Sequence, residues 1–180
     1  MELINGIKER RSIRKYTDKK VDPELVKEII SAAIYAPSWK NSQTSRYTLI
    51  NDEKLKNRIA VEATCGFAKN SGVIQSAPAL IVLSTVKGVS GYNLDGSFTT
   101  DKGEHWQSFD AGIAAEAFCL AAYAKGLGTL IMGIYDEGKV KELVNIPENE
   151  GVSALIALGY YDAEVKVPNR KTVGEITRIL

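Results

Sequence analysis

Two short polar segments contain the residues whose types and spacing could do chemistry. Near the amino terminus, Arg10 and Arg14 are four residues apart, with Ser12 between them. If a helix that begins near residue 2 continues that far, both guanidinium groups share one of its faces. Arginine forms strong and often bidentate hydrogen bonds to phosphate, and the serine adds a hydroxyl donor. The segment predicts a site for a compact anion, with a solvated helix face as the alternative.

The second segment, residues 36–43, has the sequence Ala-Pro-Ser-Trp-Lys-Asn-Ser-Gln and follows an apolar helix. Asn41 and Gln43 each present a donor beside an acceptor, which suits the edge of a heterocycle. Plain turns have a similar composition. A heterocycle-binding loop and a structural turn therefore both remain open for this segment.

Other kinds of chemistry find little support. His105 is the only histidine, and no Cys/His/carboxylate cluster has metal-ligand spacing, so we expect no metal site. No GxSxG elbow or GxxxxGK[ST] loop is present. Gly126-Leu127-Gly128 fails as a dinucleotide fingerprint because Ile131 replaces the third glycine and a helix precedes it. We interpret His105 as a loop residue.

Composition indicates one ordinary globular domain over residues 1–180. The hydrophobic fraction is 44%, the charged fraction 25% and the net charge +1, which gives no bulk electrostatic reason to bind nucleic acid or an acidic membrane. Cys65 and Cys119 lie far apart, so we expect reduced thiols. With no recognisable leader or membrane span, we expect a cytoplasmic protein.

Periodicity and breaker residues predict an α+β domain built on a small sheet. The predicted helices are 2–11, 23–36 (capped by Asp22), 53–62, 109–125 and 137–144 (capped by Asp136); the predicted strands are 47–50, 79–84, 129–134 and 152–160. Helix 109–125 is apolar on nearly every side, so it lies in the core or against a partner. Loop 87–105 is long enough to be functional or mobile. The tail, residues 162–180, is expected to run over a surface, either of its own chain or of a neighbouring subunit.

Together these segments resemble the nitroreductase family. The matching pieces are Arg10-Arg11-Ser12-Ile13-Arg14, Ala36-Pro37-Ser38 with Asn41 and Gln43, Gly126-Leu127-Gly128, and Arg170-Lys171, in the family's order and spacing. The resemblance implies a three-layer α/β/α fold with a small central, mainly antiparallel sheet. It also implies an intertwined homodimer that binds FMN at the interface.

The resemblance implies a role for each part of the site. Arg10 and Arg170 or Lys171 would bind the phosphate, and Ser12 and Arg14 the ribityl chain and pyrimidine edge. Arg14 would also stabilise the negative charge on reduced FMN, with no other catalytic side chain. The other subunit would supply Pro37, Ser38 and Asn41, while the backbone of residues 131–133 would lie near N5. The full expected set is Arg10, Arg11, Ser12, Arg14, Pro37, Ser38, Trp39, Asn41, Gln43, Asn70, Ile131, Met132, Gly133, Arg170 and Lys171.

The implied activity is ping-pong reduction of nitroaromatics, quinones or similar planar acceptors with NADH or NADPH. Specialised relatives remain alternatives: a dehalogenase of iodinated tyrosine, a flavin-fragmenting enzyme or an azoline-oxidising enzyme. A flavin-binding storage or sensor protein without turnover and a non-flavin interaction domain are further alternatives. Two departures are visible. Thr44-Ser45 follow Gln43 where many members have Pro-Trp, and the chain is short, so loop 87–105 would cover the flavin with Tyr92, Phe98 and Trp106.

Overall fold

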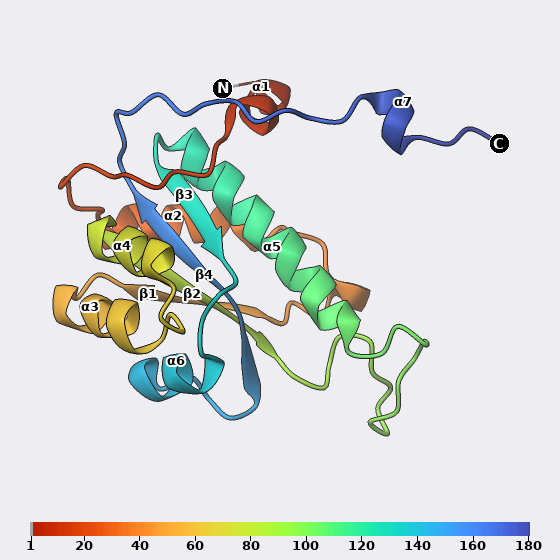
Figure 1. Ribbon diagram of the computed structural model, residues 1–180. Coiled ribbons are helices and arrows are strands. Elements are labelled where there is room, and N and C mark those ends of the chain that lie inside the picture. The colour runs from red at the N-terminus through yellow and green to blue at the C-terminus, as the bar shows by residue number, and fades with distance from the viewer. Residues whose placement is uncertain (1) are drawn as a thin grey trace.

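The computed structural model describes residues 2–180, which form a four-stranded sheet with helices on both faces (Figure 1). The strand order is β1-β2-β4-β3, and every neighbouring pair is antiparallel. The strands are β1 (Ser45–Ile50), β2 (Ala79–Val86), β3 (Gly128–Met132) and β4 (Glu150–Gly159). The helices are α1 (Leu3–Glu9), α2 (Pro23–Ala33), the short 3₁₀ helix η1 (Trp39–Asn41), α3 (Glu53–Glu62), α4 (Ala68–Ser76), α5 (His105–Ala124), α6 (Glu137–Val144) and α7 (Val173–Ile176).

Strand β2 shows why the sheet has a core on each face. Successive side chains of a strand point to opposite faces. Leu80 and Val82 are buried against α3, α4 and α6, whereas Ile81 and Leu83 are buried against α2 and α5. The first side is called the closed face here and the second the open face. Two covered faces make three layers, so the predicted α/β/α architecture and antiparallel sheet are confirmed.

Helix caps predicted from the sequence are also confirmed. The Asp22 carboxylate accepts a hydrogen bond from the Glu24 amide at 3.0 Å, and Pro23 occupies the first turn of α2. Asp136 accepts from the Lys139 amide at 2.9 Å and starts α6. Each carboxylate satisfies one of the amides that a helix start leaves unpaired. The start points of α2 and α6 are therefore predictable from local chemistry.

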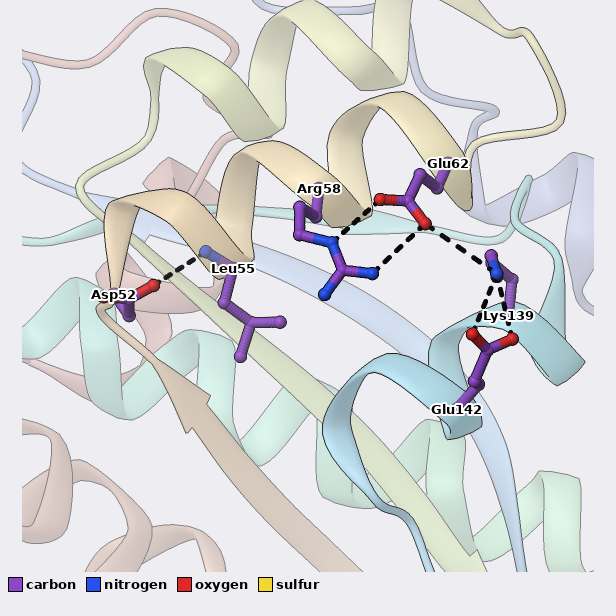
Figure 2. Close-up of polar contacts among 6 residues, drawn as sticks. All are labelled: Asp52, Leu55, Arg58, Glu62, Lys139 and Glu142. Atoms are coloured by element: carbon purple, nitrogen blue, oxygen red, sulfur yellow. Dashed lines mark hydrogen bonds and ion pairs between the residues drawn. The ribbon is translucent and has the colours of Figure 1, made fainter.

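The closed face carries an ion-pair network on its outer surface, shown in Figure 2. Arg58 donates to Glu62 at 2.9 Å within α3. Lys139 of α6 lies 3.8 Å from the same glutamate and 2.9 Å from Glu142. The network links α3 to α6 across the surface.

The first helix is shorter than predicted, and this changes the argument for Arg10 and Arg14. Helix α1 ends at Glu9, and residues 10–14 are not helical. Ser12 instead bridges to Thr129, and the Ile13 amide donates to the Thr129 carbonyl at 2.9 Å. The helical i, i+4 prediction is wrong, because pairing with β3 satisfies the backbone and lets Ile13 be buried. In an extended segment alternate residues share a side, so Ser12 and Arg14 face the same way, as they would not in a helix.

Several other elements differ from prediction. Helix α2 ends three residues before its predicted end, and β1 and β4 each begin two residues before their predicted starts. Helix α4 is not predicted, because its sequence contains Gly72 and has no clear apolar stripe. Helix α5 begins at His105, so the interpretation of His105 as a loop residue is wrong. Strand β3 ends at Met132, two residues before its predicted end.

The segment before α5 and the tail after β4 differ in their internal support. Residues 88–104 contain a Tyr92–Phe98 bridge, and the Thr99 amide donates to the Gly91 carbonyl at 2.9 Å, so this loop holds its own shape. The tail crosses near α1 and then leaves the body of the chain as an exposed segment that includes α7 (Figure 1). Within the described residues, no helix is long and apolar enough to cross a membrane.

Candidate functional site

The outer edge of β3 is the centre of the candidate site. β3 is an edge strand, and the Thr129 carbonyl points outward to Ile13. By the two-residue period of a strand, the backbone of Ile131 also points outward. No hydrogen bond found among residues 2–180 engages that outward amide. A Cβ placed on Gly133 would meet nothing within 4 Å, so the edge is open to a ligand there.

The side chains of β3 divide between the two faces. Ile131 points to the open face and is 45% exposed, so it can contact a ligand directly. Met132 points to the closed face and is only 3% exposed. Of the predicted residues 131–133, Met132 can therefore contribute only its backbone.

Three more predicted residues lie along this edge. Arg14 is exposed and donates to the Ser12 carbonyl at 3.2 Å, which holds its guanidinium next to the Ser12–Thr129 bridge. Asn70 of α4 donates to the Ile134 carbonyl at 3.1 Å. The fold thus gathers an amide, a hydroxyl and a fixed cation beside an open backbone edge.

Arg10 and Arg11 have different partners. Arg10 is half-buried, and its Nε lies 3.3 Å from Glu116 Oε1 on α5. This contact uses Nε and leaves the two terminal nitrogens of the guanidinium for an anion. Arg11 donates to the carbonyls of Lys8 and Arg10 at 2.6 and 2.8 Å, so it caps the end of α1. Sequence reasoning misses Glu116, because it interrupts an apolar helix without any motif.

Residues 37–43 form a tight, strained loop. Lys40, Asn41 and Gln43 have φ angles of 46°, 55° and 49°. Non-glycine residues rarely adopt positive φ, and such strain persists only where surrounding contacts impose it. One contact is internal, from the Gln43 amide to Ser38 Oγ at 2.9 Å. The other comes from α5, where Asp110 accepts the Trp39 amide.

The same loop and the residue after it hold three buried polar atoms without a hydrogen-bond partner in the described part of the chain: Trp39 Nε1, Ser42 Oγ and Thr44 Oγ1. Buried polar groups are nearly always paired, so a cluster of unpaired ones indicates a missing ligand, water or partner. The Trp39 ring lies 4.6 Å from that of Trp106. The predicted aromatics Tyr92 and Phe98 contact each other at 5.0 Å in loop 88–104, and their contact with a ligand remains a prediction.

The remaining predicted residues are not brought to the site within one chain. Arg170 and Lys171 are exposed on the tail, and no hydrogen bond or ion pair within residues 2–180 involves them. Pro37 borders an apolar groove of about 1090 Å³ along the outer side of α5, on the opposite side of that helix from the sheet. Large apolar side chains line the groove: Leu3, Tyr35, Phe109, Ile113 and Leu120.

Ionisable groups near the edge are not tuned for acid–base work. Tyr16 donates to the Ile13 carbonyl at 2.8 Å, and burial raises the pKa of its hydroxyl. Burial also raises the pKa of the Cys119 thiol. Both groups stay protonated at neutral pH, so neither serves as a general base.

Comparison with known proteins gives one consistent result. A sequence model of the nitroreductase family matches residues 7–160. An Archaeoglobus fulgidus protein, named as a candidate NADH dehydrogenase/NAD(P)H nitroreductase, is 30% identical over 163 residues, which cover 88% of this chain and 85% of that protein. The solved FMN-dependent nitroreductase of Clostridium difficile R20291 is 29% identical with a TM-score of 0.73, covering 92% of this chain and 91% of the other. An iodotyrosine deiodinase of Nematostella vectensis is 27% identical over 199 residues, covering 97% of this chain and 74% of that protein.

Proposed function

Because this chain belongs to the nitroreductase family, we propose that it is an FMN-dependent oxidoreductase that takes electrons from NADH or NADPH. The observation that carries the proposal is the open outer edge of β3. There an outward backbone amide at Ile131 lies in line with Ser12 and Arg14. A planar heterocycle with alternating donors and acceptors matches that edge.

The chemical character of the residues fits FMN. Ser12, Arg14 and the backbone of residues 131–133 would hold the ring system and ribityl chain, and Arg10 would bind the phosphate. When bound, FMN supplies the electron-transfer chemistry itself. Arg14 places a fixed positive charge where negative charge develops, which stabilises it electrostatically. Burial raises the pKa of Tyr16 and of Cys119, so both groups are poor proton donors, and protons would come from solvent.

The proposal includes a homodimer of one-domain chains, residues 1–180. The apolar groove along α5 and the unpaired polar atoms of residues 39–44 both need a covering surface. A second copy would supply Pro37, Ser38, Trp39, Asn41 and Gln43 to the flavin, and Arg170 or Lys171 from its tail or from the same chain. A stable interface of this kind buries more than about 2,000 Å² in total. Two free cysteines support a cytoplasmic location within the same proposal.

Donor and acceptor would use the same space in turn. Loop 88–104 is held by its own hydrogen bonds, and in this proposal it would cover the flavin so that one planar ligand enters at a time. Nitroaromatics and quinones would be accepted with modest discrimination, because planarity is the main feature recognised. Initial rates at varied concentrations of both substrates test this order. Parallel double-reciprocal lines are expected, and intersecting lines would contradict it.

The absorption spectrum of the purified protein tests the cofactor proposal. A flavin spectrum is expected, as isolated or after addition of FMN, and it should bleach on anaerobic addition of NADH or NADPH. Protein that stays colourless with added FMN would overturn the flavin proposal. Bound FMN that neither nicotinamide reduces would instead indicate a storage or sensor protein.

A second candidate reaction is reductive dehalogenation. It is favoured by the similarity to the iodotyrosine deiodinase, which extends over 97% of this chain. Iodide release from iodotyrosine under reducing, anaerobic conditions measures it directly. Turnover of quinones without iodide release would exclude this candidate.

A further inference from the structure

Asp110, near the start of α5, is a buried carboxylate that the proposed flavin contacts do not include. It is 3% exposed. Its Oδ1 and Oδ2 accept the Trp39 amide at 3.1 and 3.0 Å, and Oδ2 also accepts the Ser90 hydroxyl at 2.6 Å. No lysine or arginine pairs with it among residues 2–180.

A buried carboxylate without a cation is costly unless dipoles surround it. Here one peptide amide and one hydroxyl offset that cost, and hydrogen bonds to a charged acceptor are stronger than neutral ones. An apolar side chain would fill the same volume without this cost. The presence of a carboxylate at this position is therefore explained by its hydrogen bonds to Trp39 and Ser90 and not by packing.

Asp110 ties together two segments that are far apart in sequence. One is the strained loop 37–43, which has three residues at positive φ. The other is loop 88–104, which contains Ser90 and is followed by Trp106, whose ring lies tilted against that of Trp39 at 4.6 Å. Among residues 2–180, the Trp39 amide is the one group of the strained loop that hydrogen-bonds to Asp110, and the loop's unpaired polar atoms begin at the same residue.

We propose that Asp110 is the positioning residue of the flavin site. It fixes the Trp39 peptide, and so keeps loop 37–43 in the conformation that meets FMN bound by the partner subunit. This inference rests on the proposed function. Asp110 is buried and its hydrogen bonds go to Trp39 and Ser90, so in this proposal it acts through the loop.

The first experiment measures FMN dissociation constants by fluorescence titration of apoprotein. Asp110→Ala should weaken FMN binding about ten- to hundredfold, the effect of losing charge-assisted hydrogen bonds. Asp110→Asn keeps an acceptor for the Trp39 amide and should recover part of that loss. Ser90→Ala removes a single bond and should have a smaller effect still.

The stability control is Lys56→Met. Lys56 is 2% exposed, donates to the Ala77 carbonyl and pairs with Glu53 on the closed face. This variant lowers stability without touching loop 37–43, so FMN affinity of the folded protein should not change. If Asp110→Ala and Asp110→Asn bind FMN as wild type does, the inference is wrong. It is equally wrong if Lys56→Met weakens FMN binding as much as Asp110→Ala does.

Mixed dimers with two different affinity tags test whether the loop acts across the interface. With Arg10→Ala in one subunit and Asp110→Ala in the other, one site is intact and about half the FMN of wild type should bind. With both substitutions in one subunit and none in its partner, neither site is intact and both should bind weakly. The reverse pattern would show that Asp110 serves its own subunit's flavin and overturn the inference. Failure of wild type to bind FMN would instead overturn the proposed function.

Discussion

The two faces of the sheet differ in how complete they are within one chain. On the closed face, α3, α4 and α6 bury a continuous apolar cluster, two of the helices start at capping aspartates, and an ion-pair network joins α3 to α6 (Figure 2). On the open face, α5 starts without a side-chain cap and leaves an apolar groove, while the adjoining residues 39–44 keep three polar atoms unpaired. Both faces have an apolar core, but only the closed face is complete within one chain, and the open face leaves apolar and polar surface for a partner or ligand.

The largest expected effect comes from charging the open face. Ile113→Asp places a carboxylate in the groove of α5 and should weaken dimerisation more than about a hundredfold, because burying an unpaired charge is costly. Flavin should be lost with the partner. Sedimentation velocity and FMN content measure both effects. Val61→Asp, on the exposed surface of α3, is the matched control and should leave a flavin-loaded dimer.

A large-to-small substitution in the core of the closed face should lower stability without changing FMN affinity. Ile59, on the inner side of α3, is fully buried, and Ile59→Ala should cost about 2–5 kcal/mol of unfolding free energy. Urea denaturation at one fixed protein concentration measures this cost. Val61→Ala, from the exposed side of the same helix, should cost far less. A large change in the FMN affinity of folded Ile59→Ala would show that the faces are not independent.

Substitution of one arginine on each side of the sheet compares the two faces directly. Arg10 and Arg58 each contact one glutamate, at 3.3 and 2.9 Å. Arg10→Ala should remove a phosphate ligand and raise the FMN dissociation constant about ten- to hundredfold. Arg58→Ala should leave it unchanged. Equal effects in titrations of the two apoproteins would contradict the assignment of Arg10.

The smallest effect concerns the ion-pair network of the closed face. The hydrogen bond from Arg58 lowers the pKa of Glu62, so the carboxylate stabilises the fold above the ordinary glutamate pKa and loses that contribution as pH falls through its lowered value. Glu62→Gln should lower Tm slightly at pH 7 and hardly at all at pH 3. The difference should also shrink in 1 M salt, where the Debye length is about 3 Å. A Tm difference independent of pH would exclude the electrostatic explanation.

The sequence predicts those helices and strands whose signals depend only on neighbouring residues. Asp22 and Asp136 mark helix starts, and the apolar run of β2 marks a central strand, because capping and alternation depend only on neighbouring residues. The same local reasoning fails at Arg10 and Arg14, where it predicts a helix. The chain extends there because Thr129, distant in sequence, supplies a backbone partner.

Residues that act through tertiary contacts cannot be found in this way. Asp110 and Glu116 lie within an apolar helix, and only the fold shows that one holds the Trp39 amide and the other Arg10. Arg170 and Lys171 are the opposite case, because the sequence resemblance identifies them but the fold of a single chain leaves them exposed on the tail. Their predicted contact with phosphate is not tested by the contacts within residues 2–180 and stays a prediction.

The attachment of residues 12–17 has a consequence for the order in which the protein matures during synthesis. The Ile13 amide needs Thr129 as its partner, and Thr17 binds the Tyr160 carbonyl, 143 positions later in the chain. At typical elongation rates of about 5–20 residues per second, roughly 7–30 s separate the synthesis of these partners. The segment that bears Ser12 and Arg14 emerges from the ribosome early, but its hydrogen bonds to Thr129 and Tyr160 can form only after those residues have been synthesised. Both cores also need β4, the last strand to be made, so the core and the ligand-binding edge are completed together at the end of synthesis.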